Sequence, residues 1–96
     1  MSKTYDVVWT NRAAKQLKAL DKKQQLLLFN WVEKNLQGCA NPKEIQGVKK
    51  LQGTDSGWRF RVGSYRLLTT IKDNELIIEV VRVGHRREVY SNFPKM

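Results

Sequence analysis

The stretch Trp58-Arg-Phe-Arg-Val-Gly-Ser-Tyr-Arg66 decides the fold, because its first five residues alternate strictly. Side chains alternate across a strand, so Trp58, Phe60 and Val62 are predicted on the core face and the two intervening arginines on the opposite face. The sequence predicts two further strands, Tyr65 to Lys72 and Glu75 to Val83, joined by a tight turn at Asp73-Asn74. This half of the chain is therefore predicted to be an antiparallel meander.

In the first half of the chain, most apolar residues recur at the spacing of a helix rather than of a strand. Thr4 to Trp9 alternates and predicts a strand, after which Thr10-Asn11 is typical of a helix N-cap. Apolar residues then recur at helical spacing up to Asp21, where a second helix is predicted to begin and run to Gly38. Glycines punctuate the segment after Asn41-Pro42, which leaves room for one short strand around Lys49 to Gln52.

The predicted fold class follows from this order of elements. It is α+β, with an N-terminal strand and a two-helix hairpin packed on a three- to four-stranded, mainly antiparallel sheet. With 96 residues, the chain is expected to form one domain over 1–96 with one modest core. The hydrophobic fraction of 41% excludes a wholly disordered chain.

The net positive charge of the chain favours negatively charged partners. Lys and Arg number 18 against 9 Asp and Glu, and a formal charge of +9 attracts polyanions and acidic protein segments. Only Arg12 of the arginines lies before Trp58, whereas lysines fill the first half. Because the planar guanidinium group suits bidentate phosphate contacts, the second half is predicted to carry the function.

Several classes of site and location are disfavoured. Cys39 is the only cysteine, so no intramolecular disulfide can form, and no Cys/His spacing predicts a metal site. No apolar stretch is long enough to span a bilayer, and Met1 to Asp6 lacks the pattern of a signal peptide. We therefore expect a cytoplasmic protein with no membrane association and no metal or other cofactor.

Four segments together resemble a known family. They are Lys50-Leu-Gln-Gly53, Trp58-Arg-Phe-Arg61, Ser64-Tyr-Arg-Leu67, and Val83-Gly-His-Arg86 followed by Glu88-Val-Tyr90. This combination resembles the RelE branch of the RelE/ParE toxin superfamily, and the resemblance covers essentially the whole chain. It implies the fold known as the RelE-like microbial RNase fold.

The resemblance also implies a function. RelE-like toxins belong to type II toxin-antitoxin systems, and they cleave mRNA in the A site of a translating ribosome without a metal ion. Their mechanism drives the 2′-hydroxyl of the RNA onto the adjacent phosphate. The partners implied are a cognate antitoxin protein, mRNA and the rRNA of the 70S ribosome, and the outcome is inhibited translation.

The site residues implied by the resemblance are mostly cationic. The catalytic set is Arg59, Arg61, Arg66, Arg86 and Tyr90, with His85 as a further candidate. Lys49, Lys50 and Arg87 are expected to contact RNA without taking part in the chemistry. The chain departs from the family in having arginines at the two strand positions where the best-known members have lysines.

That departure leaves the general base open. Arginine stays protonated at any working pH, so Tyr90, acidified by Arg86 and Arg87, or His85, which titrates near neutrality, would have to accept the proton. Simpler interpretations exist as well. The strand arginines could be a solvated face of an amphipathic strand, and an isolated histidine is more often a surface residue than a catalyst.

Two other functions compete with the nuclease. A ParE-like inhibitor of DNA gyrase would share the fold but lack the nuclease residues. A noncatalytic nucleic-acid-binding module would need only the positive charge, and its binding would depend strongly on salt. The set of Arg66, Arg86 and Tyr90 argues against the ParE-like function, because gyrase inhibition would not need a cationic cluster that ends in a phenol.

Overall fold

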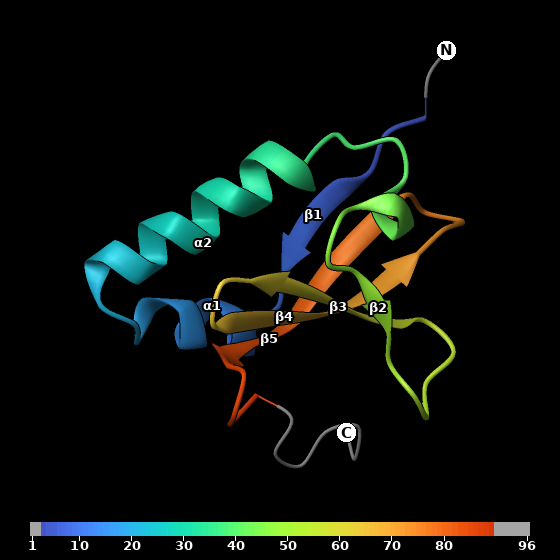
Figure 1. The fold of residues 1–96 in the computed structure, drawn as a ribbon. Helices are drawn as coiled ribbons and strands as arrows, with labels where there is room; N and C mark the ends of the chain where they lie inside the picture. Colours follow the sequence, from blue (N-terminus) through green and yellow to red (C-terminus); the bar gives the residue numbers. More distant parts are fainter. Residues whose placement is uncertain (1–2, 90–96) are drawn as a thin grey trace.

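The chain folds as two helices packed on one five-stranded sheet (Figure 1). The computed structural model describes residues 3–89. The elements are β1 (Asp6–Trp9), α1 (Asn11–Lys18), α2 (Lys22–Asn35), a 3₁₀ turn η1 (Pro42–Glu44), β2 (Lys49–Lys50), β3 (Gly57–Val62), β4 (Tyr65–Lys72) and β5 (Ile77–His85). This confirms the predicted α+β class and the predicted order of elements.

The sheet has the strand order β1-β5-β4-β3-β2. The three pairs β2–β3, β3–β4 and β4–β5 are antiparallel, and β1 runs parallel to β5, with Asp6 opposite Ile77 and Trp9 opposite Val80. The predicted antiparallel strands correspond to β2–β5, and the predicted N-terminal strand joins them as a fifth, parallel strand. Parallel pairing between distant segments leaves no turn signature, so the alternation of 4–9 could not reveal its partner.

Side-chain caps fix the helix ends. The Thr10 hydroxyl accepts a hydrogen bond from the Ala13 amide at 3.1 Å, and the Asp21 carboxylate accepts one from the Gln24 amide at 2.9 Å. Both caps satisfy amides that a helix leaves unpaired in its first turn, as predicted for these residues. The Gln25 side chain donates to the carbonyls of Lys18 and Leu20, which ties the end of α1 to the start of α2.

The core lies between the helices and the sheet. Leu28, Val32 and Leu36 are fully buried and face Phe60 and other strand residues of the same cluster. The remaining members that are fully buried on the sheet are Leu67, Ile78 and Val80. Apolar burial of this kind supplies most of the stabilisation of a small domain. One face of the sheet is thereby occupied, which leaves the opposite face for function.

The β4–β5 turn is longer than predicted. Leu76 has a φ of 56°, in the left-handed region that a branched side chain rarely adopts, and β5 begins only at Ile77. The strand then continues to His85, two residues beyond the predicted end at Val83. The parallel partner β1 begins opposite Ile77, so tertiary pairing rather than local propensity sets the start of β5.

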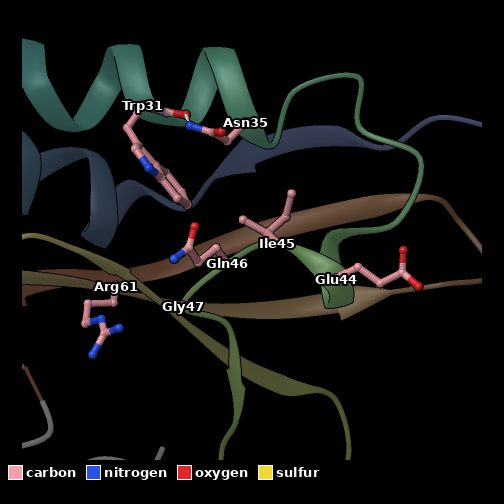
Figure 2. Close-up of a pocket in the computed structure, with 7 residues that line it drawn as sticks. All are labelled: Trp31, Asn35, Glu44, Ile45, Gln46, Gly47 and Arg61. Atoms are coloured by element: carbon pink, nitrogen blue, oxygen red, sulfur yellow. Dashed lines mark hydrogen bonds between the residues drawn. The ribbon is translucent and has the colours of Figure 1, made fainter.

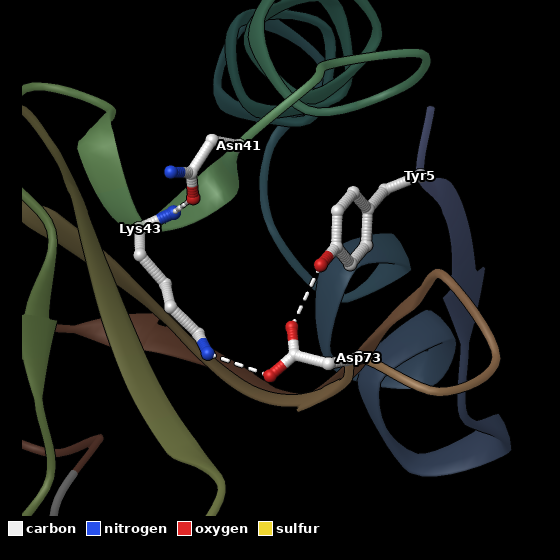
Figure 3. A network of polar contacts seen from close by, with 4 residues as sticks. All are labelled: Tyr5, Asn41, Lys43 and Asp73. Carbon is white, nitrogen blue, oxygen red and sulfur yellow. Dashed lines mark hydrogen bonds and ion pairs between the residues drawn. The ribbon is translucent and has the colours of Figure 1, made fainter. Parts of the chain in front are cut away.

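A polar network joins this turn to the rest of the fold (Figure 3). The Tyr5 hydroxyl donates to Asp73 at 2.7 Å, and the Lys43 ammonium group lies 2.6 Å from the other carboxylate oxygen. Lys43 lowers the pKa of Asp73 by its hydrogen bond, and Tyr5 adds to the effect; the same bond to Asp73 raises the pKa of Tyr5. Three distant segments are thus fastened at the end of the sheet remote from the β3–β4 turn.

Candidate nucleic-acid interface

Three arginines lie on the sheet face that the helices leave open. Arg61 stands directly opposite Arg66 in the β3–β4 pair, and Arg59 stands opposite Leu68. Directly opposed residues share a face, and their neighbours Phe60 and Leu67 point into the core. The structure therefore brings together Arg59, Arg61 and Arg66, as the alternation in the sequence predicted for the two strand arginines.

The β3–β4 turn anchors the Arg66 side chain. Its Nη1 atom donates to the carbonyls of Gly63 and Tyr65, each at 2.9 Å. Gly63 has a φ of +59°, a conformation that favours glycine in a two-residue hairpin loop. The guanidinium group is held at the end of the sheet by backbone carbonyls, so its position does not depend on a long flexible side chain alone.

The chain after β5 folds back over the same end of the sheet. The Arg86 amide donates to the Ser64 carbonyl at 2.8 Å, and the amides of Glu88 and Val89 both donate to the His85 carbonyl at 2.9 Å. Val89 is buried against Gly84, where a Cβ atom would lie 3.4 Å from the Val89 Cβ. Gly84 stands opposite Arg66, so the backbone of this turn lies beside Arg66, and the side chains of Arg86 and Arg87 are exposed.

Tyr90 lies outside the described residues. Its role in catalysis therefore stays a prediction, and the last residue that the structure describes is Val89.

Arg82 was missed by the sequence analysis. It stands opposite Leu68 on the open face but is only 7% exposed, and its Nη1 atom donates to the Val89 carbonyl at 3.5 Å. Desolvation lowers the pKa of Arg82, and the positive charge of Arg12 adds to this effect. The signal available in the sequence was that Arg82 and Gly84 share a face of β5, beneath the segment that resembles the family.

His85 lies on the other face of the sheet from the arginines. It pairs with Tyr65, and the two rings meet edge to face with centroids 5.8 Å apart. The Nδ1 atom of His85 accepts a hydrogen bond from the Arg87 amide at 3.2 Å. The structure therefore separates this candidate base from Arg59, Arg61 and Arg66, because Tyr65 points with the core set.

A cavity of about 430 Å³ lies beside His85. Its walls come from the end of α1, the end of β5 and the turn that follows, and they include Gln16, Leu20, Tyr65 and Glu88. The cavity places His85 near a carboxylate and a phenol rather than near the strand arginines. Arg82 and Gly84 also line the cavity, so it borders the open face at that end of β5, although Arg59, Arg61 and Arg66 do not line it.

The two lysines of β2 point in different directions. Lys49 stands opposite Arg59 and shares its face, whereas Lys50 stands opposite Trp58, with its ammonium group 6.0 Å from the centre of the indole ring. Lys43 lies 5.4 Å from the same ring. Of the two lysines predicted to contact RNA, only Lys49 extends the arginine face.

Within residues 3–89, no three His, Cys, Asp or Glu side chains gather as ligands of a metal ion would. None of the helices that the structure describes is long and apolar enough to cross a bilayer.

Comparison with known proteins identifies the family. A family model described as the ParE toxin of type II toxin-antitoxin systems, parDE, matches residues 7–90. The chain belongs to the RelE/ParE toxin superfamily. Its relatives place this toxin in the RelE-like part of the superfamily, as the motifs predicted. The protein RelE1 of Methanocaldococcus jannaschii is 28% identical over 88 residues, which cover 92% of this chain and 97% of the relative.

Solved structures support the same placement. The RelE–RelB complex from Pyrococcus horikoshii has a TM-score of 0.70 and 25% identity, covering 90% of this chain and 99% of that chain. A variant of the RelE toxin from E. coli, with two arginines changed to alanine, has a TM-score of 0.71 and 24% identity, covering 96% of each chain. The complex from P. horikoshii supports membership of the family. The variant from E. coli, at lower identity, supports the fold alone.

Proposed function

We propose that this RelE-like toxin is a ribosome-dependent endoribonuclease that cleaves mRNA in the A site by attack of a 2′-hydroxyl group on the adjacent phosphate. The observation that carries the proposal is the convergence of Arg61, Arg66 and the Arg86 backbone on the β3–β4 turn. An exposed cationic surface on a rigid sheet suits a phosphodiester whose charge grows in the transition state.

The chemistry assigns a different task to each group. The 2′-oxygen attacks phosphorus while its proton passes to a base, and the P–O5′ bond breaks as the 5′-oxygen takes up a proton. Arg61 and Arg66 hold the phosphate oxygens, and Arg86 neutralises the charge that develops on the phosphorane or the leaving oxygen. Arg59 and Lys49 contact the RNA backbone beside the scissile bond.

The position of His85 supports Tyr90 as the base. His85 shares its sheet face with Tyr65, away from the strand arginines, which leaves Tyr90 as the other candidate base from the sequence. A phenol ordinarily titrates near pH 10, so neighbouring Arg86 and Arg87 would be needed to make it a base at neutral pH.

A second candidate function has one observation in its favour. The matching family model is that of the ParE toxin. Resemblance to the ParE branch implies inhibition of DNA gyrase. Such an inhibitor would use this surface for protein contact and would leave mRNA intact. We rank it second because gyrase inhibition gives no reason for Arg61, Arg66 and Arg86 to converge.

The partner proposed for this toxin is a cognate antitoxin protein. Solved relatives from P. horikoshii and E. coli are complexes with RelB, an antitoxin in the E. coli case. The outer side of α2 exposes Leu26, Leu27 and Phe29 by 50%, 48% and 43%, and exposed apolar groups of this size commonly mark a protein interface. An acidic segment of the same partner would then cover the arginines.

Primer extension on a defined mRNA in a purified translation system tests the nuclease proposal. Wild type, Arg86→Ala and Tyr90→Phe are compared with and without ribosomes, and Lys34→Ala, which removes an exposed cation of α2, serves as the control. New 3′ ends that need ribosomes, weaken in the two site variants and persist in the control are expected. An intact mRNA in all reactions would overturn the proposal, and loss of DNA supercoiling by gyrase would then favour the ParE-like function.

A further inference from the structure

A second cavity lies on the opposite side of β3 from the arginine face. It has a volume of about 490 Å³, within the range of small-ligand sites, and it is open to solvent. Trp31 and Asn35 of α2 form one wall, and Ile45, Gln46 and Gly47 of the following loop form another (Figure 2). Figure 2 shows the Arg61 guanidinium group pointing away from these side chains, so Arg61 belongs to both surfaces.

The edge of β3 connects the cavity to the arginine face. β2 pairs only with Trp58 and Arg59, so the strand edge beyond Arg59 has no strand beside it within residues 3–89. Val62 and Tyr65 form the pair that closes the hairpin, and in such a pair the two residues exchange backbone hydrogen bonds. The next residue along β3, Arg61, therefore directs its peptide groups away from β4. The N–H and C=O groups of Arg61 therefore face the cavity while its side chain reaches the other face.

Gly47 supplies the backbone conformation that the loop adopts beside Arg61. It has a φ of +89°, and a Cβ atom at this position would lie 3.5 Å from the Arg61 Cβ and 3.6 Å from the Arg61 carbonyl oxygen. A residue other than glycine would be strained in this conformation. The loop consequently lies against the edge of β3 and closes the cavity beneath Trp31.

The lining groups match the features of a nucleobase. Trp31 is half-buried, with its ring packed on Phe60 at 6.1 Å between centroids, so the indole is held in place and is partly accessible. The Asn35 amide nitrogen donates to the Trp31 carbonyl at 2.9 Å, which leaves its carbonyl oxygen as an acceptor. Gln46 is exposed and makes no side-chain hydrogen bond in the part of the chain that the structure describes.

We propose that this cavity is a nucleobase subsite for single-stranded RNA, in which a base lies against Trp31 and its edge bonds to Asn35 and Gln46. Proteins bind unpaired bases by stacking on aromatic rings and by hydrogen bonds to their edges, and carboxamides match the adjacent donor and acceptor of adenine. The phosphate of that nucleotide passes over the β3 edge to Arg61. This inference depends on the proposed function in one respect, which is that the ligand is an RNA substrate.

Binding of a free nucleotide tests the subsite without a ribosome. Adenosine 3′-monophosphate is titrated into ¹⁵N-labelled protein, and the indole N–H signal of Trp31 is assigned by comparison with Trp31→Phe. Ribose 5-phosphate is the probe that carries a phosphate but no base. A saturable shift of the Trp31 signal with the nucleotide, absent with ribose 5-phosphate, is expected.

A matched pair of double variants locates the binding. Asn35→Ala with Gln46→Ala should weaken the nucleotide about tenfold, as expected for two lost hydrogen bonds. Asn30→Ala with Gln52→Ala changes the same residue types at exposed positions outside the cavity and should leave the affinity unchanged. Primer extension then asks whether the first pair alters the base preference at the cut while cleavage itself persists.

Failure of the subsite and failure of the nuclease give different results. Ribosome-dependent cleavage with no nucleotide-induced shift of Trp31 would overturn the subsite alone. A saturable, base-dependent shift in a protein that cleaves nothing would support the subsite and overturn the nuclease. An antitoxin peptide that shifts the Trp31 signal, when the nucleotide does not, would overturn the subsite in favour of a protein contact.

Discussion

Arg61 and Arg66 stand directly opposite each other across β3 and β4, on the sheet face that carries no helix. Like charges in opposed positions destabilise a sheet, and this pair belongs to the class that exchanges no backbone hydrogen bonds, in which side chains lie closest. The fold therefore tolerates a local electrostatic cost at the place where the proposed chemistry requires two guanidinium groups.

Replacing Arg61 should separate stability from activity. Arg61→Gln removes the repulsion with Arg66, so we expect the free energy of unfolding to rise by a few tenths of a kcal/mol while cleavage falls. Urea unfolding and primer extension measure the two effects. Lys34→Gln is the control, because Lys34 is an exposed cation on α2 with no like charge opposed to it across a strand pair, and it should show no gain in stability. A loss of stability in Arg61→Gln would contradict this account.

The edge of β5 beyond β1 depends on one side chain of α1. The Gln16 side-chain oxygen accepts a hydrogen bond from the Val83 amide at 2.8 Å, where no strand is available to do so. Gln16→Leu should cost about 1–3 kcal/mol in unfolding free energy, because a part-buried amide loses its acceptor. Gln16→Glu retains an acceptor and should lose less. Hydrogen exchange at the Val83 amide should quicken in Gln16→Leu only.

The Tyr5–Asp73–Lys43 network should make stability depend on pH. The pKa of Asp73 is lowered in the folded state, so its contribution is present above the unfolded-state pKa of about 4 and is lost as pH falls through the folded value. Asp73→Asn should therefore reduce stability at neutral pH and flatten the loss on acidification. Urea unfolding between pH 3 and pH 7, at buffer values of about one unit apart, measures this difference.

The matched control for that series is Asp55→Asn. Asp55 is exposed and makes no hydrogen bond or ion pair within the described stretch of chain, so its removal should leave the acid side of the profile unchanged. The raised pKa of Tyr5 has the opposite sign: its contribution is present below the unfolded-state value and is lost as pH rises through the folded one. In Tyr5→Phe, the loss of stability at alkaline pH that comes from Tyr5 should accordingly disappear.

The outer side of α2 should matter for the antitoxin and little for the fold. Leu26→Ser combined with Phe29→Ser removes exposed apolar surface, and surface changes of this kind usually alter stability by less than about 0.5 kcal/mol each. Binding to the cognate antitoxin, measured by calorimetry, should weaken. Asn30→Ser with Glu33→Ser alters polar positions of the same helix, and an equal loss of affinity in both double variants would argue against an apolar contact.

The sequence predicted the elements whose signals are local. The alternation at Trp58, Phe60 and Val62 placed β3 and its two faces correctly, Thr10 was correctly placed at a helix N-cap, and Asp21 was correctly placed at the start of the second helix. Each of these depends on spacing along one segment, which a single sequence displays directly.

Signals that depend on distant segments were missed or misjudged. The parallel pairing of β1 with β5, the left-handed Leu76 and the burial of Arg82 all arise from contacts between residues far apart in the chain. The separation of His85 from the strand arginines has the same origin, because only the register of β4 with β5 fixes which face His85 occupies. Residues chosen by motif could not reveal it.

The position of β5 between β1 and β4 also has a kinetic consequence during synthesis. β1 is made first, yet its partner is the last strand to leave the ribosome, and the two pair only after Ile77 has emerged. At elongation rates of about 5–20 residues per second, the first strand waits several seconds for that partner. The sheet therefore closes only after β5 has been made, and until then the facing edges of β1 and β4 lack the strand that joins them.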